Sequence, residues 1–246
     1  MTLDPIFFYA LLFIVAFLYA AVGHGGASGY LALMAIFSFT PEVMKPTALL
    51  LNLFVSLISF IQFYRGKHFQ WKIFWPFAVA SVPLAFIGGM ISLESAVYKK
   101  ILGFLLLIPI IKFLFFPAQT AASHKKPVLI LSLLIGGIIG FLSGLIGIGG
   151  GIILSPVLLL LKWTDQKQTA AIGAAFIFVN SLSGLIGQLR KGVTFSQDMV
   201  IYVLIAFAGG LLGAYFGALK FRQSAIQFLL ALVLIMAAYK LIFTTA

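Results

Sequence analysis

Cysteine is absent from the 246-residue chain, and charged residues are scarce. The lack of cysteine excludes disulfides, thiolate metal ligands and a cysteine nucleophile. Asp, Glu, Lys and Arg together make up 9% of the residues, whereas a soluble domain carries about 25%. Because 63% of the residues are hydrophobic and the mean hydropathy is +1.18, the chain cannot cover a water-facing surface. The composition predicts an all-α integral membrane protein whose surroundings are the lipid bilayer.

Acidic residues are the rarest charged group, with five in the chain. All of them fall in loops or at the ends of predicted membrane spans: Asp4, Glu42, Glu94, Asp165 and Asp198. Cation pumps and proton relays usually carry a carboxylate inside the membrane. The sequence also lacks an H-E-x-x-H zinc helix and a G-x-x-x-x-G-K-[ST] phosphate loop. We therefore expect no enzyme, no metal site and no cofactor.

Basic residues outnumber acidic ones and give a formal net charge of +11. They are scattered in small groups between apolar runs, as in loops that follow the positive-inside rule, so we expect no nucleic-acid partner. The first apolar run has no basic segment before it, which favours a retained first helix over a signal peptide.

Long apolar runs dominate the chain, and crossing the membrane takes about 20 apolar residues. The runs that qualify or nearly qualify are 6–22, 44–64, 73–91, 96–116, 128–146, 168–189, 199–219 and 224–243. Two shorter apolar pieces, 26–39 and 151–161, directly follow glycine clusters. Their length predicts half-helices or re-entrant segments, which line protein-buried cavities in transporters.

The order of features indicates two homologous halves, each with about four spans and one glycine-initiated short segment. In each half a glycine cluster is followed by an Asn, a Gln and an Arg. We place the first repeat at 1–116, a connecting loop at 117–127 and the second repeat at 128–246. The halves are parallel if the short segments are re-entrant, and inverted if they cross. The distribution of Lys and Arg slightly favours inversion, whereas segment length favours re-entrance.

Glycines also recur four residues apart, a spacing that lets membrane helices approach closely. These glycines are Gly136, Gly140 and Gly144 in one run and Gly209, Gly213 and Gly217 in another. We interpret both sets as helix-packing surfaces.

The two glycine clusters are the candidate binding site. They comprise Gly23, His24, Gly25 and Gly26 in the first half and Gly147, Gly149, Gly150 and Gly151 in the second. A glycine cluster that opens a helix presents free N–H groups, and the helix dipole adds partial positive charge there. Two such ends facing one cavity would bind a small anion without a buried Lys or Arg. The alternative is that the glycines only permit a kink.

Polar side chains after each cluster are further candidates for substrate binding: Asn52 and Gln62 in the first half, Asn180 and Gln188 in the second. They are neutral donors suited to oxyanion oxygens, or they hydrogen-bond between helices. Arg65 and Arg190 are candidate entrance charges, or they only set topology. His24 could couple transport to protons, or it is a satisfied polar group.

These residues resemble the TauE/SafE sulfite exporter family, also called the toluene-sulfonate uptake permeases. The likeness covers nearly the whole chain and is strongest from Gly144 to Pro156, where G-x-G-G-G is followed by a proline. The first copy departs from this pattern, because it contains His24 and no equivalent proline. The resemblance implies a secondary transporter of small sulfur-containing anions in a bacterial inner membrane.

Composition, repeats and resemblance together predict a transporter of sulfite, thiosulfate or an organosulfonate that works by alternating access. The rivals are an anion channel and a membrane scaffold that transports nothing. The expected partner is the small anion, with coupled protons and a homodimer as open alternatives.

Overall fold

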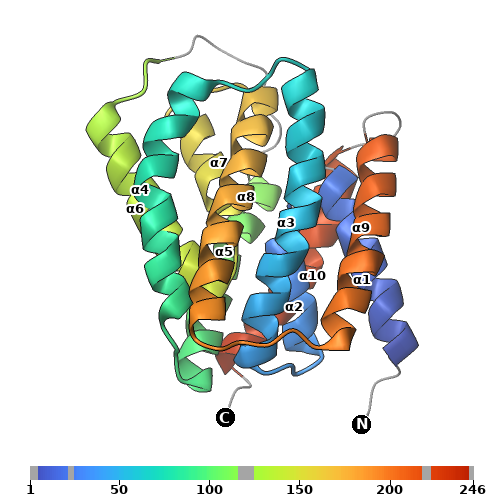
Figure 1. Ribbon diagram of the computed structural model, residues 1–246. Helices are drawn as coiled ribbons and strands as arrows, with labels where there is room; N and C mark the ends of the chain where they lie inside the picture. Colours follow the sequence, from blue (N-terminus) through green and yellow to red (C-terminus); the bar gives the residue numbers. More distant parts are fainter. Residues whose placement is uncertain (1–4, 22–24, 116–124, 218–222, 244–246) are drawn as a thin grey trace.

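The protein is a bundle of α-helices (Figure 1). The computed structural model describes residues 5–21, 25–115, 125–217 and 223–243, which form ten helices and no strand. The helices are α1 (Pro5–Ala21), α2 (Ala27–Ile36), α3 (Pro41–Arg65), α4 (Trp71–Met90), α5 (Ser95–Phe115), α6 (Leu129–Ile146), α7 (Gly151–Leu160), α8 (Gln166–Arg190), α9 (Gln197–Gly217) and α10 (Gln223–Phe243). Each of the eight long runs predicted from the sequence lies largely within one helix.

The helices fit a membrane in length and composition. Among the described residues, α3, α4, α6 and α8 are each long and apolar enough to cross it, and α1, α2, α7 and parts of α9 and α10 are shorter apolar helices. Large apolar side chains such as Ile138 of α6, 62% exposed, and Leu204 of α9, 63% exposed, face outward. Such a surface is stable only against lipid, so the chain is a multi-pass membrane protein.

Each glycine break joins two antiparallel helices. Phe8, near the start of α1, packs on Phe37, just after α2, with ring centroids 5.1 Å apart. Just before α6 begins and just after α7 ends, the Lys125 N–H donates to the Lys162 carbonyl at 2.8 Å. Each pair therefore turns at its break and returns to the end of the bundle where it entered. The ten-residue helices α2 and α7 confirm short helices that begin at glycines.

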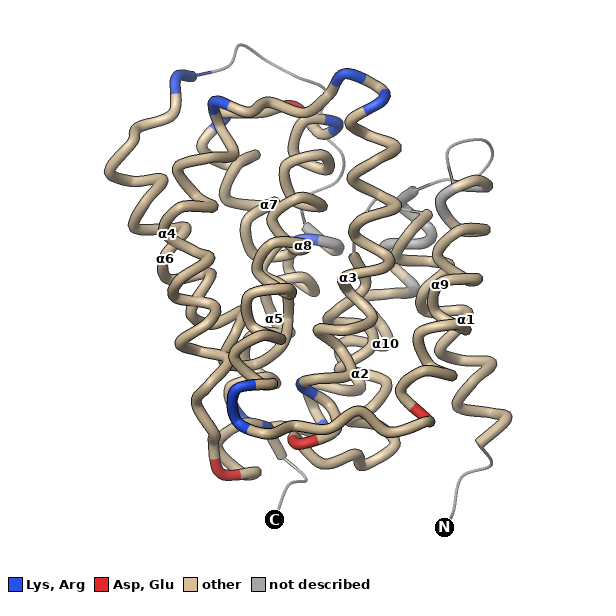
Figure 2. Tube along the Cα trace, in the orientation of Figure 1, with Lys and Arg blue, Asp and Glu red and all other residues tan. Residues whose placement is uncertain are grey.

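Helices α3 and α8 lie side by side and antiparallel (Figure 1). Leu49 of α3 lies beside Gly184 of α8, and Asn52 bonds Ser181. The helices therefore end at opposite ends of the bundle, here called the Lys45 end, where α3 begins, and the Arg65 end. Lys and Arg gather at both ends (Figure 2).

Glycines of α6 let its backbone pack directly on α4. A Cβ on Gly136 would lie 2.6 Å from the Phe77 carbonyl oxygen, and Gly140 and Gly144 lie closer still to the α4 backbone one and two turns further along. No larger residue fits at these positions, so the predicted packing surface is confirmed.

Helix α9 packs on α1 in the same way. A Cβ on Gly209 would lie 2.5 Å from the Phe13 carbonyl oxygen, and Gly213 approaches the α1 backbone one turn further along more closely. Gly217, the third member of the predicted set, lies outside the residues whose packing is described.

The first five and the last five helices have nearly the same lengths in the same order. The short helices have 10 residues each, and α3 and α8 have 25 each. Helix α1 of the first set packs on α9 of the second, and α6 of the second set packs on α4 of the first. Most of the predicted connecting loop at 117–127 lies outside the described residues.

Candidate functional site

The break between α6 and α7 is built from glycines in the left-handed region. Gly147, Gly149 and Gly150 have φ of 87°, 73° and 76°, a conformation that costs other residues about 1–2 kcal/mol. Gly150 is the N-cap of α7 and has no side chain to accept from the first-turn N–H groups. Gly151 opens the helix and packs against α8. The break therefore leaves the N-terminus of α7 bare of capping groups.

The break between α1 and α2 has a similar end. Gly26 has φ of 83° and is the N-cap of α2, again without a side-chain cap. Gly25 packs against α8, where a Cβ on it would lie 2.8 Å from Ile177 Cδ1. The predicted site residues Gly23 and His24 lie outside the described residues.

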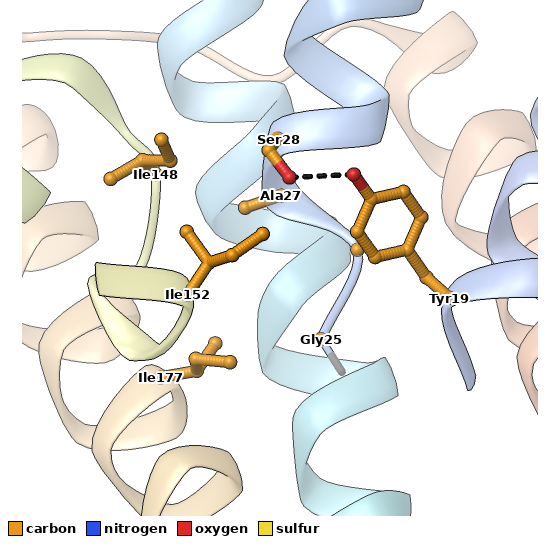
Figure 3. A pocket seen from close by; sticks show the side chains of 8 residues that line it. Tyr19, Gly25, Ala27, Ser28, Ile148, Ile152 and Ile177 are labelled. Atoms are coloured by element: carbon orange, nitrogen blue, oxygen red, sulfur yellow. Dashed lines mark hydrogen bonds between the residues drawn. The ribbon is translucent and has the colours of Figure 1, made fainter. Parts of the chain in front are cut away.

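The two breaks meet at one small cavity (Figure 3). Its lining residues are Tyr19, Gly25, Gly26, Ala27, Ser28, Ile148, Ile152 and Ile177. Figure 3 shows the first break and α2 on one side, and Ile148 of the second break and Ile152 of α7 opposite. The Tyr19 and Ser28 hydroxyls hydrogen-bond each other at 2.7 Å, and the other side chains of the lining are apolar.

The cavity is too small for an oxyanion as it stands. Its volume is about 10 Å³, roughly the room that a single water molecule needs. Any larger ligand therefore requires the surrounding helices to move apart.

A polar contact between α3 and α8 lies against the second break. The Asn52 Nδ2 group is 3.4 Å from the Ser181 hydroxyl oxygen. A Cβ on Gly149 would lie 2.7 Å from Asn52 Nδ2 and 3.2 Å from Ser181 Oγ. The structure thus brings the predicted residues Asn52 and Gly149 together. It adds Ser181, which sequence reasoning missed although it adjoins Asn180.

Asn180 and Asn52 are both fully buried, and each donates a hydrogen bond through its Nδ2 group. The Asn180 Nδ2 group donates to the Phe176 carbonyl one turn earlier at 2.8 Å. The Oδ1 atoms of both residues and the hydroxyl of Ser56 have no hydrogen-bond partner among the described residues. Each of these amides therefore has a free acceptor oxygen, while one of its two N–H donors is engaged.

The remaining predicted residues are not gathered at the breaks. Gln62 is exposed, whereas Gln188 is buried and donates through Nε2 to the Gly89 carbonyl. Arg65 and Arg190 are both exposed, and because α3 and α8 are antiparallel they lie at opposite ends of the bundle. They cannot form one entrance, although each could serve its own end.

Sequence reasoning treated Lys45 as a charge at the end of a helix, but the structure buries it. It is 5% exposed, and its ammonium lies 3.2, 3.1 and 3.1 Å from the carbonyl oxygens of Gly88, Gly89 and Ile91. These carbonyls close α4, so the lysine caps a helix C-terminus with positive charge. The signal in the sequence was a lysine at the second position of the apolar run 44–64.

A second buried lysine is Lys112 of α5. Ionisable side chains inside a membrane bundle are costly and commonly functional. The predicted spans thus hold buried basic residues, although the described acidic residues stay at helix ends.

Comparisons with known proteins agree with this architecture. The sequence matches the family described as "Sulfite exporter TauE/SafE" over residues 8–241. It is 37% identical over 234 residues to the probable membrane transporter protein y4hK of Sinorhizobium fredii, covering 94% of this chain and 95% of that one. It is 27% identical to the probable membrane transporter protein YunE of Bacillus subtilis, covering 83% and 82%.

No solved structure matches the chain. The family match spans nearly the whole chain, and the glycine breaks and the antiparallel helix pairs lie inside it. The chain belongs to the TauE/SafE sulfite exporter family of membrane transporters.

Proposed function

We propose that this membrane transporter moves a small sulfur-containing anion, such as sulfite, thiosulfate or an organosulfonate, across a bacterial inner membrane by alternating access. The observation that carries the proposal is the meeting of two uncapped helix N-termini, those of α2 and α7, at one buried cavity (Figure 3). Each N-terminus is equivalent to roughly half a positive charge.

The chemistry of the surroundings suits an anion. Among the described residues, none of the eight that line the cavity is acidic, so an anion there meets no like charge at close range. No Lys or Arg lines it either, which leaves the backbone N–H groups and the Tyr19 and Ser28 hydroxyls as donors. Binding through backbone dipoles avoids the cost of burying a basic side chain in the membrane.

The helix arrangement supports alternating access. The antiparallel α3 and α8, the matched helix lengths and the reciprocal packing of α1 on α9 and α6 on α4 are what inverted repeats produce. We infer that the two halves are inverted repeats with the cavity between them. If each repeat forms one entrance to the cavity, the two entrances lie at opposite ends of the bundle.

The contacts at the Lys45 end support a closed gate there. Lys45 of α3 and Gln188 of α8 both bond the last carbonyls of α4, and Lys191 bonds Ser92 just beyond. The three helices are thereby tied together. At the opposite end Gln62, which follows the first break as Gln188 follows the second, is exposed. Opening toward the Lys45 end would require this cluster to separate.

Transport by purified protein in liposomes tests the proposal. We expect saturable uptake of sulfite, thiosulfate or a sulfonate, and counterflow when the same anion is loaded inside. Conductance at channel rates would instead indicate an anion channel. If none of the three anions raises the Tm of the protein relative to chloride, the result would instead indicate a scaffold.

The position of the site has its own test. Gly149→Leu and Gly25→Leu fill the breaks, and we expect both variants to insert in the membrane and to lose stabilisation by the anion. The matched control for Gly149→Leu is Gly192→Leu, which likewise replaces a glycine of positive φ but has open space around it. Anion stabilisation that survives both substitutions would leave the breaks as packing devices only.

A further inference from the structure

The free oxygen of Asn52, which lies against the second break, and that of Ser56 one turn further along α3 point to a second ligand of opposite charge. Asn52 is 0% exposed, its Nδ2 is engaged with Ser181, and its Oδ1 has no partner among the described residues. Ser56 is also 0% exposed, and its hydroxyl likewise has no partner there. Because the two are four residues apart on α3, they lie on one face of the helix.

An anion cannot satisfy the Asn52 oxygen, although the Ser56 hydroxyl can either donate or accept. A carbonyl oxygen of an amide is only an acceptor, and an anion offers acceptors as well. What the Asn52 oxygen requires is a donor or a cation. We propose that Asn52 Oδ1, Ser56 Oγ and Ser181 Oγ form part of a binding site for a sodium ion next to the anion site.

The donor set selects a monovalent metal ion. The oxygens are neutral, whereas calcium and magnesium sites use carboxylates, and transition metals use His or Cys. No group of three or more His, Cys, Asp or Glu residues occurs in the part of the chain that the structure describes. Amide and hydroxyl oxygens also cannot hold a proton near neutral pH. Broken membrane helices also coordinate sodium with neutral oxygens, namely their unwound backbone carbonyls.

Charge balance gives the ion a role, which rests on the proposed anion transport. Two helix N-termini together supply roughly one positive charge. That offsets a singly charged sulfonate, but a doubly charged anion such as thiosulfate keeps one negative charge in a region of low dielectric constant. A bound sodium ion neutralises it. Sodium should therefore assist the dianion more than the monoanion.

Heat unfolding of the purified full chain, without any sulfur anion, tests the site itself. Choline chloride is replaced stepwise by sodium chloride or potassium chloride at constant ionic strength and pH. We expect a saturable rise in Tm with sodium that potassium does not reproduce. Ser56→Ala and Asn52→Leu should weaken the apparent sodium affinity at least about tenfold, as loss of metal-site groups does.

Two variants guard against unfolding as the explanation. Asn52→Asp keeps an oxygen in place and adds negative charge, so sodium stabilisation should persist or strengthen. Ser132→Ala removes an equally buried hydroxyl, but one bonded to the Val128 carbonyl in the first turn of α6, and should behave as wild type. If sodium acts no differently from potassium, or acts equally on wild type, Ser56→Ala and Asn52→Leu, the site is refuted.

Adding the anions separates this proposal from the function it extends. Sodium should increase the apparent affinity for thiosulfate by a larger factor than that for methanesulfonate. If sodium stabilises the protein and no sulfur anion does, the ion site stands and the proposed substrate fails. If the anions bind equally well in sodium and in choline, the substrate stands and the coupling is wrong.

Discussion

Gly149→Ala is the smallest change that probes the second break. An alanine at φ of 73° costs about 1–2 kcal/mol in backbone strain. Its Cβ would lie 2.7 Å from Asn52 Nδ2 and 3.0 Å from Ile177 Cγ2, closer than van der Waals contact. Crowding of a packed core costs about a further 1–3 kcal/mol. We expect the variant to be destabilised by about 2–5 kcal/mol in total.

Gly192→Ala separates the two contributions. Gly192 has φ of 83°, and nothing lies within 4 Å of the position that its Cβ would take. Gly192→Ala should therefore be destabilised only by backbone strain, by about 1–2 kcal/mol. The remaining difference of about 1–3 kcal/mol would place the Tm of Gly149→Ala roughly 2–12 °C below that of Gly192→Ala.

A double substitution identifies the crowded neighbour. Asn52→Ala makes room beside Gly149, so the double variant should recover part of the crowding cost, and a double-mutant cycle measures that coupling. Equal melting temperatures for Gly149→Ala and Gly192→Ala would refute the crowding. Strictly additive effects of Gly149→Ala and Asn52→Ala would show that Asn52 is not the neighbour that matters.

Three further predictions concern stability, each read as a change in Tm. Lys45→Met removes the ammonium from three carbonyls, of which Gly88 and Gly89 keep the Ile91 N–H and Gln188 Nε2 while Ile91 loses its donor, and should cost about 1–3 kcal/mol; an unchanged Tm would show that the Ile91 carbonyl finds another donor. Asp165→Ala removes the side-chain half of the capping box of α8, the bond from the Gln168 N–H to Asp165 Oδ1, and should cost about 0.5–2 kcal/mol; Asp165→Asn keeps an acceptor there and should lose little of this stability. Gly140→Ala should be strongly destabilising because its Cβ meets α4 backbone, whereas Gly137→Ala on the same helix meets only a flexible side-chain end at 3.0 Å; similar melting temperatures for the two would contradict the packing described.

The two short helices could be predicted from sequence because their cause is local. Runs starting at 26 and 151 were expected, and helices start at Ala27 and Gly151. Glycine alone adopts the left-handed backbone freely, so a cluster of glycines inside an apolar run marks a break before any tertiary contact is known. The remaining helices could likewise be predicted from the lengths of the apolar runs.

The equivalence of Gln62 and Gln188 was predicted from their order in the chain, and the structure places them differently. Gln188 is buried against the end of α4, and Gln62 is exposed. The two glutamines follow their breaks at similar distances, but burial depends on which helix ends beside each one. That depends on packing between the halves, which a repeat pattern does not encode.

The burial of Lys45 escaped sequence reasoning for a related reason. A lysine near a helix start resembles a loop charge in sequence, and the partners that retain it are carbonyls of Gly88, Gly89 and Ile91, more than forty residues away. Backbone acceptors leave no mark in the sequence. They can be identified only once the packing of α3 against the end of α4 is known.

The two breaks face α3 and α8 with different chemistry. Asn52 of α3 contacts Gly149 of the second break, and Ile177 of α8 contacts Gly25 of the first. Asn52 and Ile177 stand at the same position counted from the starts of their helices. Ile177 also packs on Gly149 and Gly151, so the second break meets both an amide and an isoleucine. The lining of the cavity itself is divided the other way, because the Tyr19 and Ser28 hydroxyls lie on the α2 side, and Ile148 and Ile152 lie on the α7 side.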